Sequence, residues 1–136
     1  MPRLRTLVVL LLVTVVARPL HAQTPVTPPA DGPARIVARL QTLAQSGSAS
    51  ELEPLIAASV PPSALADFSL DFFVPGVTHA VARELDRIPL PDVPEGAGFS
   101  LIVEVFSEVG TRARVMSARA DVRRVDASAD TWRIVD

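Results

Sequence analysis

His79 is the residue best suited to acid–base chemistry, because it is the sole histidine after residue 22. An imidazole titrates near neutral pH and can act as a general acid or base when a second group orients it. Asp67 or Asp71 could supply that carboxylate, and Arg83 follows on the strand that carries the histidine. His79, Asp71 and Arg83 are therefore the catalytic candidates. The competing interpretation is a histidine at a sheet margin, bonded to backbone or water.

Metal chemistry has fewer candidates. Asp67 and Asp71 lie four residues apart, so on a helix they share a face and could bind a hard cation. A solvated helix face is the alternative, since no third ligand or glycine-containing loop accompanies them. One histidine and no cysteine cannot complete a closed zinc site. The sequence also lacks a glycine-rich phosphate loop, a nucleophile elbow and a His-Glu-x-x-His helix, so we expect no metal and no cofactor.

The missing residue types limit the chemistry further. The sequence has no cysteine, tyrosine or lysine, which excludes thiolate nucleophiles, tyrosine acids and Schiff-base lysines. Arginines gather late in the chain and could form an anion-binding rim: Arg112, Arg114, Arg119, Arg123, Arg124 and Arg133. Acidic residues lie within cross-strand reach, so mutual surface pairing is the alternative use. No aromatic residues interleave with these arginines, which argues against single-stranded nucleic acid.

Residues 1–22 have the three parts of a secretory signal peptide. Arg3 and Arg5 give a positive start, residues 6–17 form an apolar core, and Ala22 is a small residue before the cut. The apolar core is about half of the roughly 20 residues that span a bilayer, which favours a cleaved signal over an uncleaved anchor. Cleavage after Ala17 is an alternative site. We expect a secreted or periplasmic protein that leaves the membrane after cleavage.

The mature chain has the length and charge of one small acidic domain. Cleavage would leave ten arginines against 15 acidic residues, a formal charge of −5, which disfavours nucleic acid as a partner. Residues 23–32 contain three prolines and are predicted to form a linker. Residues 33–136 are predicted to form a single domain.

Three helices are expected before residue 75. Apolar residues at helical spacing predict a first helix that begins near Pro33 and stops at Gly47. A capping box predicts that the second helix begins at Ser50, where Glu53 occupies the third position. Pro61-Pro62 ends it, and a third helix follows from Ser63 with an apolar stripe of Leu65, Phe68 and Phe72.

The pattern changes to alternation after the Pro75-Gly76 turn. One face of the first strand is predicted to point inward, and it carries Val77, His79, Val81 and Leu85. A loop spans residues 89–98. The inward face of the next strand carries Phe99, Leu101, Val103 and Val105.

The following hairpin has a predictable register. A two-residue turn at Gly110-Thr111 pairs only apolar residues on one face, namely Val105 with Met116, Val103 with Ala118, Leu101 with Ala120 and Phe99 with Val122. A slip of one residue would place arginines among them. A loop over residues 127–129 then puts Val122 opposite Ile134 and Arg124 opposite Trp132, where the guanidinium could stack on the indole. The predicted fold is α+β, with two to three helices packed on a curved antiparallel meander of about four strands.

This order of elements resembles the nuclear transport factor 2-like superfamily, which includes polyketide-cyclase-like and ketosteroid-isomerase-like domains. The resemblance covers residues 33–136 and rests on the opening helix, the Leu52-x-x-Leu55-Ile56 helix and the closing strand 130–134. It implies a curved sheet wrapped on helices, forming a cone with an apolar pocket. Pro61-Pro62 departs from it by leaving little room for a short strand between the second and third helices.

A second resemblance concerns the end of the chain. Residues 75–136 look similar to amino-terminal regions that precede large exported bacterial proteins, metallopeptidases among them. The domain stops in a strand at Asp136, which suggests that it is truncated there and forms the amino-terminal module of a larger exported protein.

Two classes of function follow. The first is a non-catalytic exported domain that binds a small apolar ligand or a protein partner, or serves as the amino-terminal module of a secreted hydrolase such as a metallopeptidase. The second is a small enzyme that uses His79 as base on a lipophilic substrate, and we favour the first. A ligand pocket is predicted to be lined by Phe68, Phe72, His79, Phe99 and Val103. A homodimer through the sheet face is a further expectation.

Overall fold

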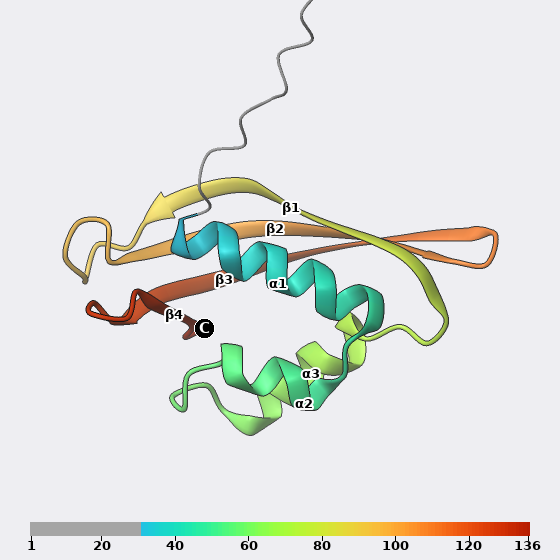
Figure 1. Cartoon of the computed structure of the whole chain (residues 1–136), viewed down its shortest axis with the longest axis horizontal. Helices are drawn as coiled ribbons and strands as arrows, with labels where there is room; N and C mark the ends of the chain where they lie inside the picture. The colour runs from blue at the N-terminus through green and yellow to red at the C-terminus, as the bar shows by residue number, and fades with distance from the viewer. Residues whose placement is uncertain (1–30) are drawn as a thin grey trace, which may run out of the picture.

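Helices come first in this chain and strands follow, with the helices on one side of the sheet (Figure 1). The computed structural model describes residues 31–136. The predicted signal peptide, residues 1–22, and nearly all of the linker lie outside that range. The helices are α1 (Gly32–Ser46), α2 (Ala49–Leu52), the 3-10 turn η1 (Glu53–Leu55) and α3 (Pro62–Phe72). The strands are β1 (Val77–Pro89), β2 (Gly98–Val109), β3 (Arg112–Asp126) and β4 (Thr131–Ile134). The predicted α+β class is confirmed.

Local sequence signals fix the ends of α1. The Asp31 carboxylate accepts a hydrogen bond from the Ala34 amide at 2.9 Å and caps the first turn, where Pro33 is well suited. The apolar stripe buries Ile36, Leu40 and Leu43 against the sheet. The helix ends at Gly47, whose amide donates to the Leu43 carbonyl at 2.8 Å. The predicted start near Pro33 and stop at Gly47 therefore agree with the structure.

The second helix begins two residues earlier than predicted. Ser48 is its cap rather than Ser50, and the Glu51 carboxylate accepts a hydrogen bond from the Ser48 amide at 3.0 Å. Both serines are followed by a glutamate three residues later, so the spacing fits either one. Pro54 lacks the amide proton that an α-helix would use, and the chain tightens there into η1.

The four strands form one antiparallel meander in the order β1-β2-β3-β4. The predicted register of the β2–β3 hairpin is confirmed at every pair, including Val105 with Met116 and Leu101 with Ala120. Gly110 adopts a φ of 59°, as a first turn residue in a tight hairpin requires. Val122 faces Ile134 and Arg124 faces Trp132, also as predicted, and the Arg124 guanidinium lies 6.0 Å from the indole centroid.

The predicted inward face of β1 is wrong after its first residue. Ala80 is 0% exposed, whereas His79, Val81 and Leu85 are exposed. The cause is a bulge between Val77 and His79, where one residue of β1 has no partner on β2. A bulge inserts one unpaired residue and exchanges the two faces of the strand beyond it.

The core lies between α1 and the inner face of the sheet, where α1 packs against β1 and β2. Leu101 and Val103 of β2 and Val122 of β3 are buried there. Figure 1 shows the β2–β3 hairpin extending past the end of α1, with α2 and α3 grouped lower in the view. The two helical groups thus meet different parts of the sheet.

Candidate functional site

An apolar cavity of about 110 Å³ lies between the η1–α3 region and the inner face of the sheet. Its helical side includes Ile56, Leu65 and Phe68, and its sheet side includes Val103 and Met116. Polar residues in the lining are Arg119 and Asp136. A cavity with these walls can hold an apolar group and offers it few hydrogen bonds.

Three of the five predicted pocket residues line this cavity. Phe68 and Phe72 come from α3, and their rings stack with centroids 5.0 Å apart, while Val103 comes from β2. Phe99 lies elsewhere, stacked on Trp132 with centroids 6.0 Å apart. His79 is exposed on the outer face of the sheet and is absent from the lining.

The catalytic candidates are not brought together. Arg83 shares the outer face of the sheet and donates from Nε to the Glu104 carboxylate at 2.9 Å. Asp71 lies on α3, on the helical side of the sheet, where it forms an exposed ion pair with Arg114 at 3.7 Å. The sheet therefore stands between Asp71 and His79, so this carboxylate does not orient the imidazole. Among the described residues, no group of three His, Cys, Asp or Glu side chains could hold a metal ion.

Sequence reasoning missed several lining residues. Val60 lies in the connection between η1 and α3, where no helical period marked it as inward. Ile56 was predicted to lie on the apolar face of the second helix, but that helix ends earlier and Ile56 lines the cavity from the same connection. Met116 and Ala118 were predicted to face inward, but as partners of β2 and not as cavity walls. Their hairpin register was the available signal. Met116 and Ala118 line a cavity because of the position of α3, which no local sequence pattern specifies.

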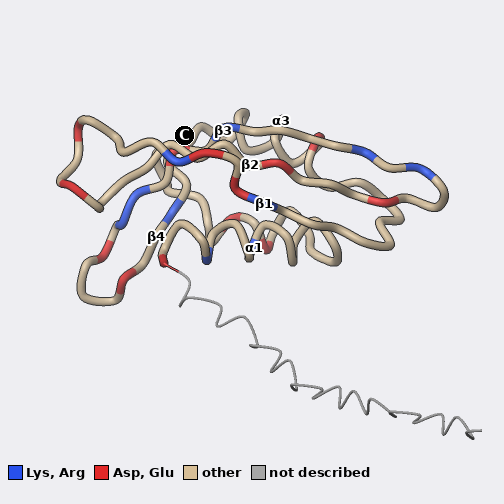
Figure 2. The backbone as a smooth tube through the Cα atoms, turned by 90° about the horizontal axis from the view of Figure 1, so that it is seen from above, with Lys and Arg blue, Asp and Glu red and all other residues tan. Residues whose placement is uncertain are grey.

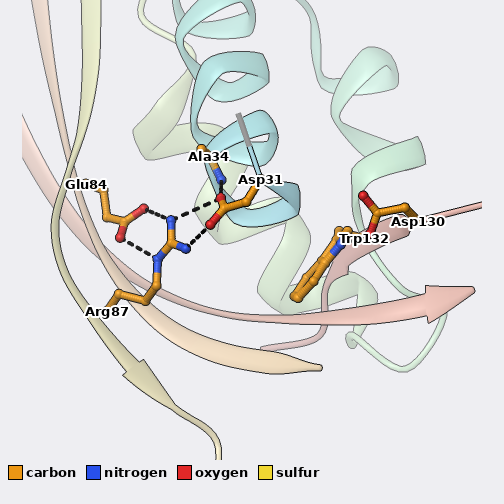
Figure 3. A network of polar contacts seen from close by, with 6 residues as sticks. All are labelled: Asp31, Ala34, Glu84, Arg87, Asp130 and Trp132. Carbon is orange, nitrogen blue, oxygen red and sulfur yellow. Dashed lines mark hydrogen bonds and ion pairs between the residues drawn. The ribbon is translucent and has the colours of Figure 1, made fainter. Parts of the chain in front are cut away.

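A polar network occupies a different part of the molecule, at the start of α1 (Figure 3). Arg87 of β1 binds the Glu84 carboxylate through two nitrogens, at 2.6 and 2.7 Å. The same guanidinium donates to the Asp31 carboxylate, which also caps α1. This network ties the first turn of α1 to β1.

The network displaces the pKa values of two of its members. The hydrogen bond from Arg87 is the main cause that lowers the pKa of the Asp31 carboxyl, and the Ala34 amide adds to it. Hydrogen bonds to Glu84 and then to Asp31 raise the pKa of the Arg87 guanidinium. None of these residues lines the cavity, and the arrangement is typical of a structural ion-pair network.

A second polar contact holds the other flank of α1. Arg35 donates to the Asp130 carboxylate at 2.5 Å, and the Trp132 indole nitrogen donates to the same carboxylate at 2.9 Å. These bonds, that from Arg35 first, lower the pKa of Asp130. Gly32 leaves room for the indole, since a Cβ there would lie 1.9 Å from its Nε1. Together the two contacts fix the start of α1 between β1 and β4.

The outer face of the sheet mixes apolar and charged side chains. Val81 and Val115 are exposed there, beside the Arg83–Glu104 pair and the Arg119–Asp121 pair. The arginines predicted as an anion-binding rim thus include several with carboxylate partners, among them Arg114, Arg119 and Arg123.

None of the helices within residues 31–136 has the length and apolar character needed to cross a membrane.

We compared the chain with known protein families, proteins and structures. No protein-family model, no curated protein and no solved structure matches the chain.

Proposed function

We propose that this domain is a non-catalytic binding module that takes a small apolar group into the cavity between α3 and the sheet. The observation that carries the proposal is the lining of that cavity. Its walls are apolar side chains from the η1–α3 region and from β2, β3 and β4. Burial of an apolar group against such walls is favourable by roughly 25 cal/mol per Å² of apolar surface.

The size of the cavity limits the occupant. A volume of about 110 Å³ is close to that of an engineered cavity of roughly 150 Å³ that takes up benzene. The occupant is therefore a single ring, a short alkyl chain or one apolar side chain. Larger ligands would need part of their surface outside the cavity.

The positions of the ionisable groups favour binding over catalysis. Asp31, Arg87, Asp126 and Asp130 have displaced pKa values, and none of them lines the cavity. His79 lies on the outer face of the sheet, so it cannot act as base on an occupant of the cavity. The alternative enzyme would have to place its reaction elsewhere.

A benzene titration tests the proposal. In ¹H–¹⁵N and methyl spectra we expect saturable shift changes at lining residues such as Phe68 and Met116. Ala118→Leu places a larger side chain in the cavity and should abolish them. Ala38→Leu makes the same change on the exposed face of α1 and should leave them intact. Non-saturable shifts, or equal shifts in both variants, would exclude the cavity as the binding site.

We also propose that this binding occurs outside the cytoplasm, in an exported accessory domain. The support is the charged start, apolar core and small-residue end of residues 1–22. Residues 1–30 fused to a phosphatase that folds only after export should give activity outside the cytoplasm. Replacement of Leu10, Leu11 and Leu12 by aspartate should abolish that activity. Unchanged phosphatase activity in this variant would refute export by this segment.

A further inference from the structure

The final strand covers only part of its neighbour. β4 pairs with β3 from Val122 to Asp126, and the Asp136 carbonyl extends the pairing by accepting from the Asp121 amide at 2.8 Å. Residues 113–119 of β3, here called the open edge, pair with β2 on one side only. Among residues 31–136, no segment pairs with the open edge on its other side.

The direction of the open hydrogen-bonding groups follows from Asp121. Its amide and its carbonyl both bond to the β4 side, at 2.8 and 2.7 Å. Successive residues of a strand present these groups to opposite sides, and the β2–β3 register has no irregularity between residues 112 and 123. The odd-numbered residues Ala113, Val115, Ser117 and Arg119 therefore direct their amides and carbonyls toward the open edge.

The other free edge of the sheet is built differently. β1 has two register shifts, between Val77 and His79 and between Glu84 and Asp86, and it ends at Pro89. Bulges and prolines are the usual devices that prevent an edge strand from pairing with another chain. The open edge has neither, and Val115 on it is 58% exposed. It remains competent to accept a further strand.

The open edge also borders the cavity. Met116, Ala118 and Ala120 alternate with the edge-facing residues and line the cavity from the inner face. An added strand would place every second side chain on this same face. Main-chain hydrogen bonds from an edge, combined with a pocket for alternate side chains, are the two components of peptide recognition by strand addition.

The positive charge near the open edge favours an acidic strand as its partner. The stretch from Arg112 to Ala120 carries three arginines and no acidic residue, and Figure 2 shows basic positions on the part of β3 nearest the hairpin turn. The Asp71 partner of Arg114 is exposed and lies 3.7 Å away, so an incoming carboxylate can replace it at little cost. The Arg119 side chain bonds to Asp121 and Ser100 but is itself 66% exposed, so it can meet a further carboxylate. A second copy of this edge would instead bring six arginines together.

We propose that the open edge binds an extended acidic peptide by strand addition and that one apolar side chain of the peptide occupies the cavity. This inference rests on the proposed function, because it identifies the apolar group as a side chain of a protein partner. The peptide contributes carboxylates toward the arginines and backbone groups toward Val115, Ser117 and Arg119.

Hydrogen exchange on the ¹⁵N-labelled protein tests this directly. The probe is a terminally blocked peptide of about eight residues, a usual strand length, with one valine near its centre for the cavity and glutamate at the other positions. Carboxylates then lie on both faces of the added strand, toward Arg112 and Arg114 on the inner face and toward Arg119 on the outer face.

We expect exchange at Val115, Ser117 and Arg119 to slow by about tenfold or more, since these amides gain acceptors. The amides of Met116 and Ala118 already face β2 and serve as internal controls that should not change. A lysine–valine peptide should bind at least about tenfold more weakly.

Matched variants separate the backbone contacts from other effects. Ser117→Pro removes one edge amide and should weaken binding about tenfold, which corresponds to about 1.4 kcal/mol, whereas Ser117→Ala keeps the amide and the affinity. A glutamate–valine peptide with N-methyl groups at alternate residues tests the same bonds with the protein unchanged, and it should not protect the edge.

Three results would overturn the proposal. The first is equal affinity for the acidic and basic peptides, and the second is equal affinity for the N-methylated and unmethylated acidic peptides. The third is slowed exchange at the edge amides without any peptide that becomes stronger as the protein concentration rises, which would identify a second copy of the chain as the occupant. Benzene uptake tests the cavity alone. If benzene binds and the acidic peptide leaves the edge unprotected, the peptide proposal fails while the cavity proposal stands. If neither binds, both fail.

Discussion

The inner face of the sheet is covered in two different ways. Where α1 lies on β1 and β2, side chains such as Ile36, Leu40 and Leu43 are almost entirely buried, and Leu43 is only 1% exposed. Where α3 approaches the sheet, Phe72 is the one buried residue of the helix, and Leu70 is 80% exposed. The first contact is a packed core and the second leaves a cavity.

The polar contacts follow the same division. Asp31 and Arg87 fix the start of α1 to β1, and Arg35 and Asp130 fix it toward β4. The described polar tie between α3 and the sheet is the exposed Asp71–Arg114 pair at 3.7 Å. The difference indicates that the packing under α1 contributes more to the stability of the domain than the contact of α3, while the α3 region provides a space that an occupant can fill.

The largest expected effect is the loss of packing under α1. Leu43→Ala should lower the free energy of unfolding by about 3 kcal/mol, because it removes a fully buried side chain and leaves a cavity. Leu65→Ala makes the same change in α3, where the side chain is only half-buried, and should lower it by about 1 kcal/mol. Urea unfolding measures both, and equal losses would contradict the division between the two regions.

A smaller effect is expected from the charge of Asp31. Asn is as good a helix cap as Asp, so Asp31→Asn isolates the interaction of the carboxylate with Arg87. The stabilisation should be below about 1 kcal/mol, because the pair is partly exposed to solvent.

The pH dependence of this effect has a definite sign. The pKa of Asp31 is lowered in the folded protein, so its contribution is complete at pH values above the ordinary aspartate pKa and is lost as the pH falls through the lowered value. The difference in unfolding free energy between the wild type and Asp31→Asn should therefore be constant above about pH 5 and shrink below about pH 4. A difference that grows on acidification would show that the pair does not stabilise the fold.

The smallest effect is expected at the outer face of the sheet. His79→Ala should change the free energy of unfolding by less than about 0.5 kcal/mol and leave benzene uptake unchanged, because the imidazole is exposed and lies outside the cavity. Unfolding curves and the benzene titration measure both quantities. If a turnover is found for this domain and His79→Ala abolishes it, the non-catalytic proposal is refuted.

Much of the β-sheet could be predicted because its constraints are local. The Gly110-Thr111 turn and the alternation of β2 and β3 admit one register, since a shift by one residue would bury arginines. The start and end of α1 could be predicted for a similar reason: Gly47 and the apolar stripe from Ile36 to Leu43 act within a few residues. The pocket was predicted in part, through the stripe that carries Phe68 and Phe72.

The inward face of β1 could not be predicted, because it depends on a bulge near Thr78 that no residue type marks. Val77 and Val81 are equally hydrophobic, so side-chain type alone does not show which of them is buried. In the folded protein α1 lies so close to β1 that the Gln41 amide oxygen accepts a hydrogen bond from the Ala82 backbone at 3.1 Å, and small residues suit that face. The bulge between Val77 and His79 also places the His79 side chain on the outer face of the sheet.

The sequence by itself determined the order of the elements, the hairpin register and the α+β class, since each depends on residues that are close together in the chain or face each other across a tight turn. Only the tertiary structure decided which face of β1 is buried, that Asp31 meets Arg87, and that α3 leaves a cavity over a stretch of β3 that pairs with β2 alone. Those features depend on how separate elements approach one another. The approach is set by the sum of many contacts between residues far apart in the chain, which no short pattern contains.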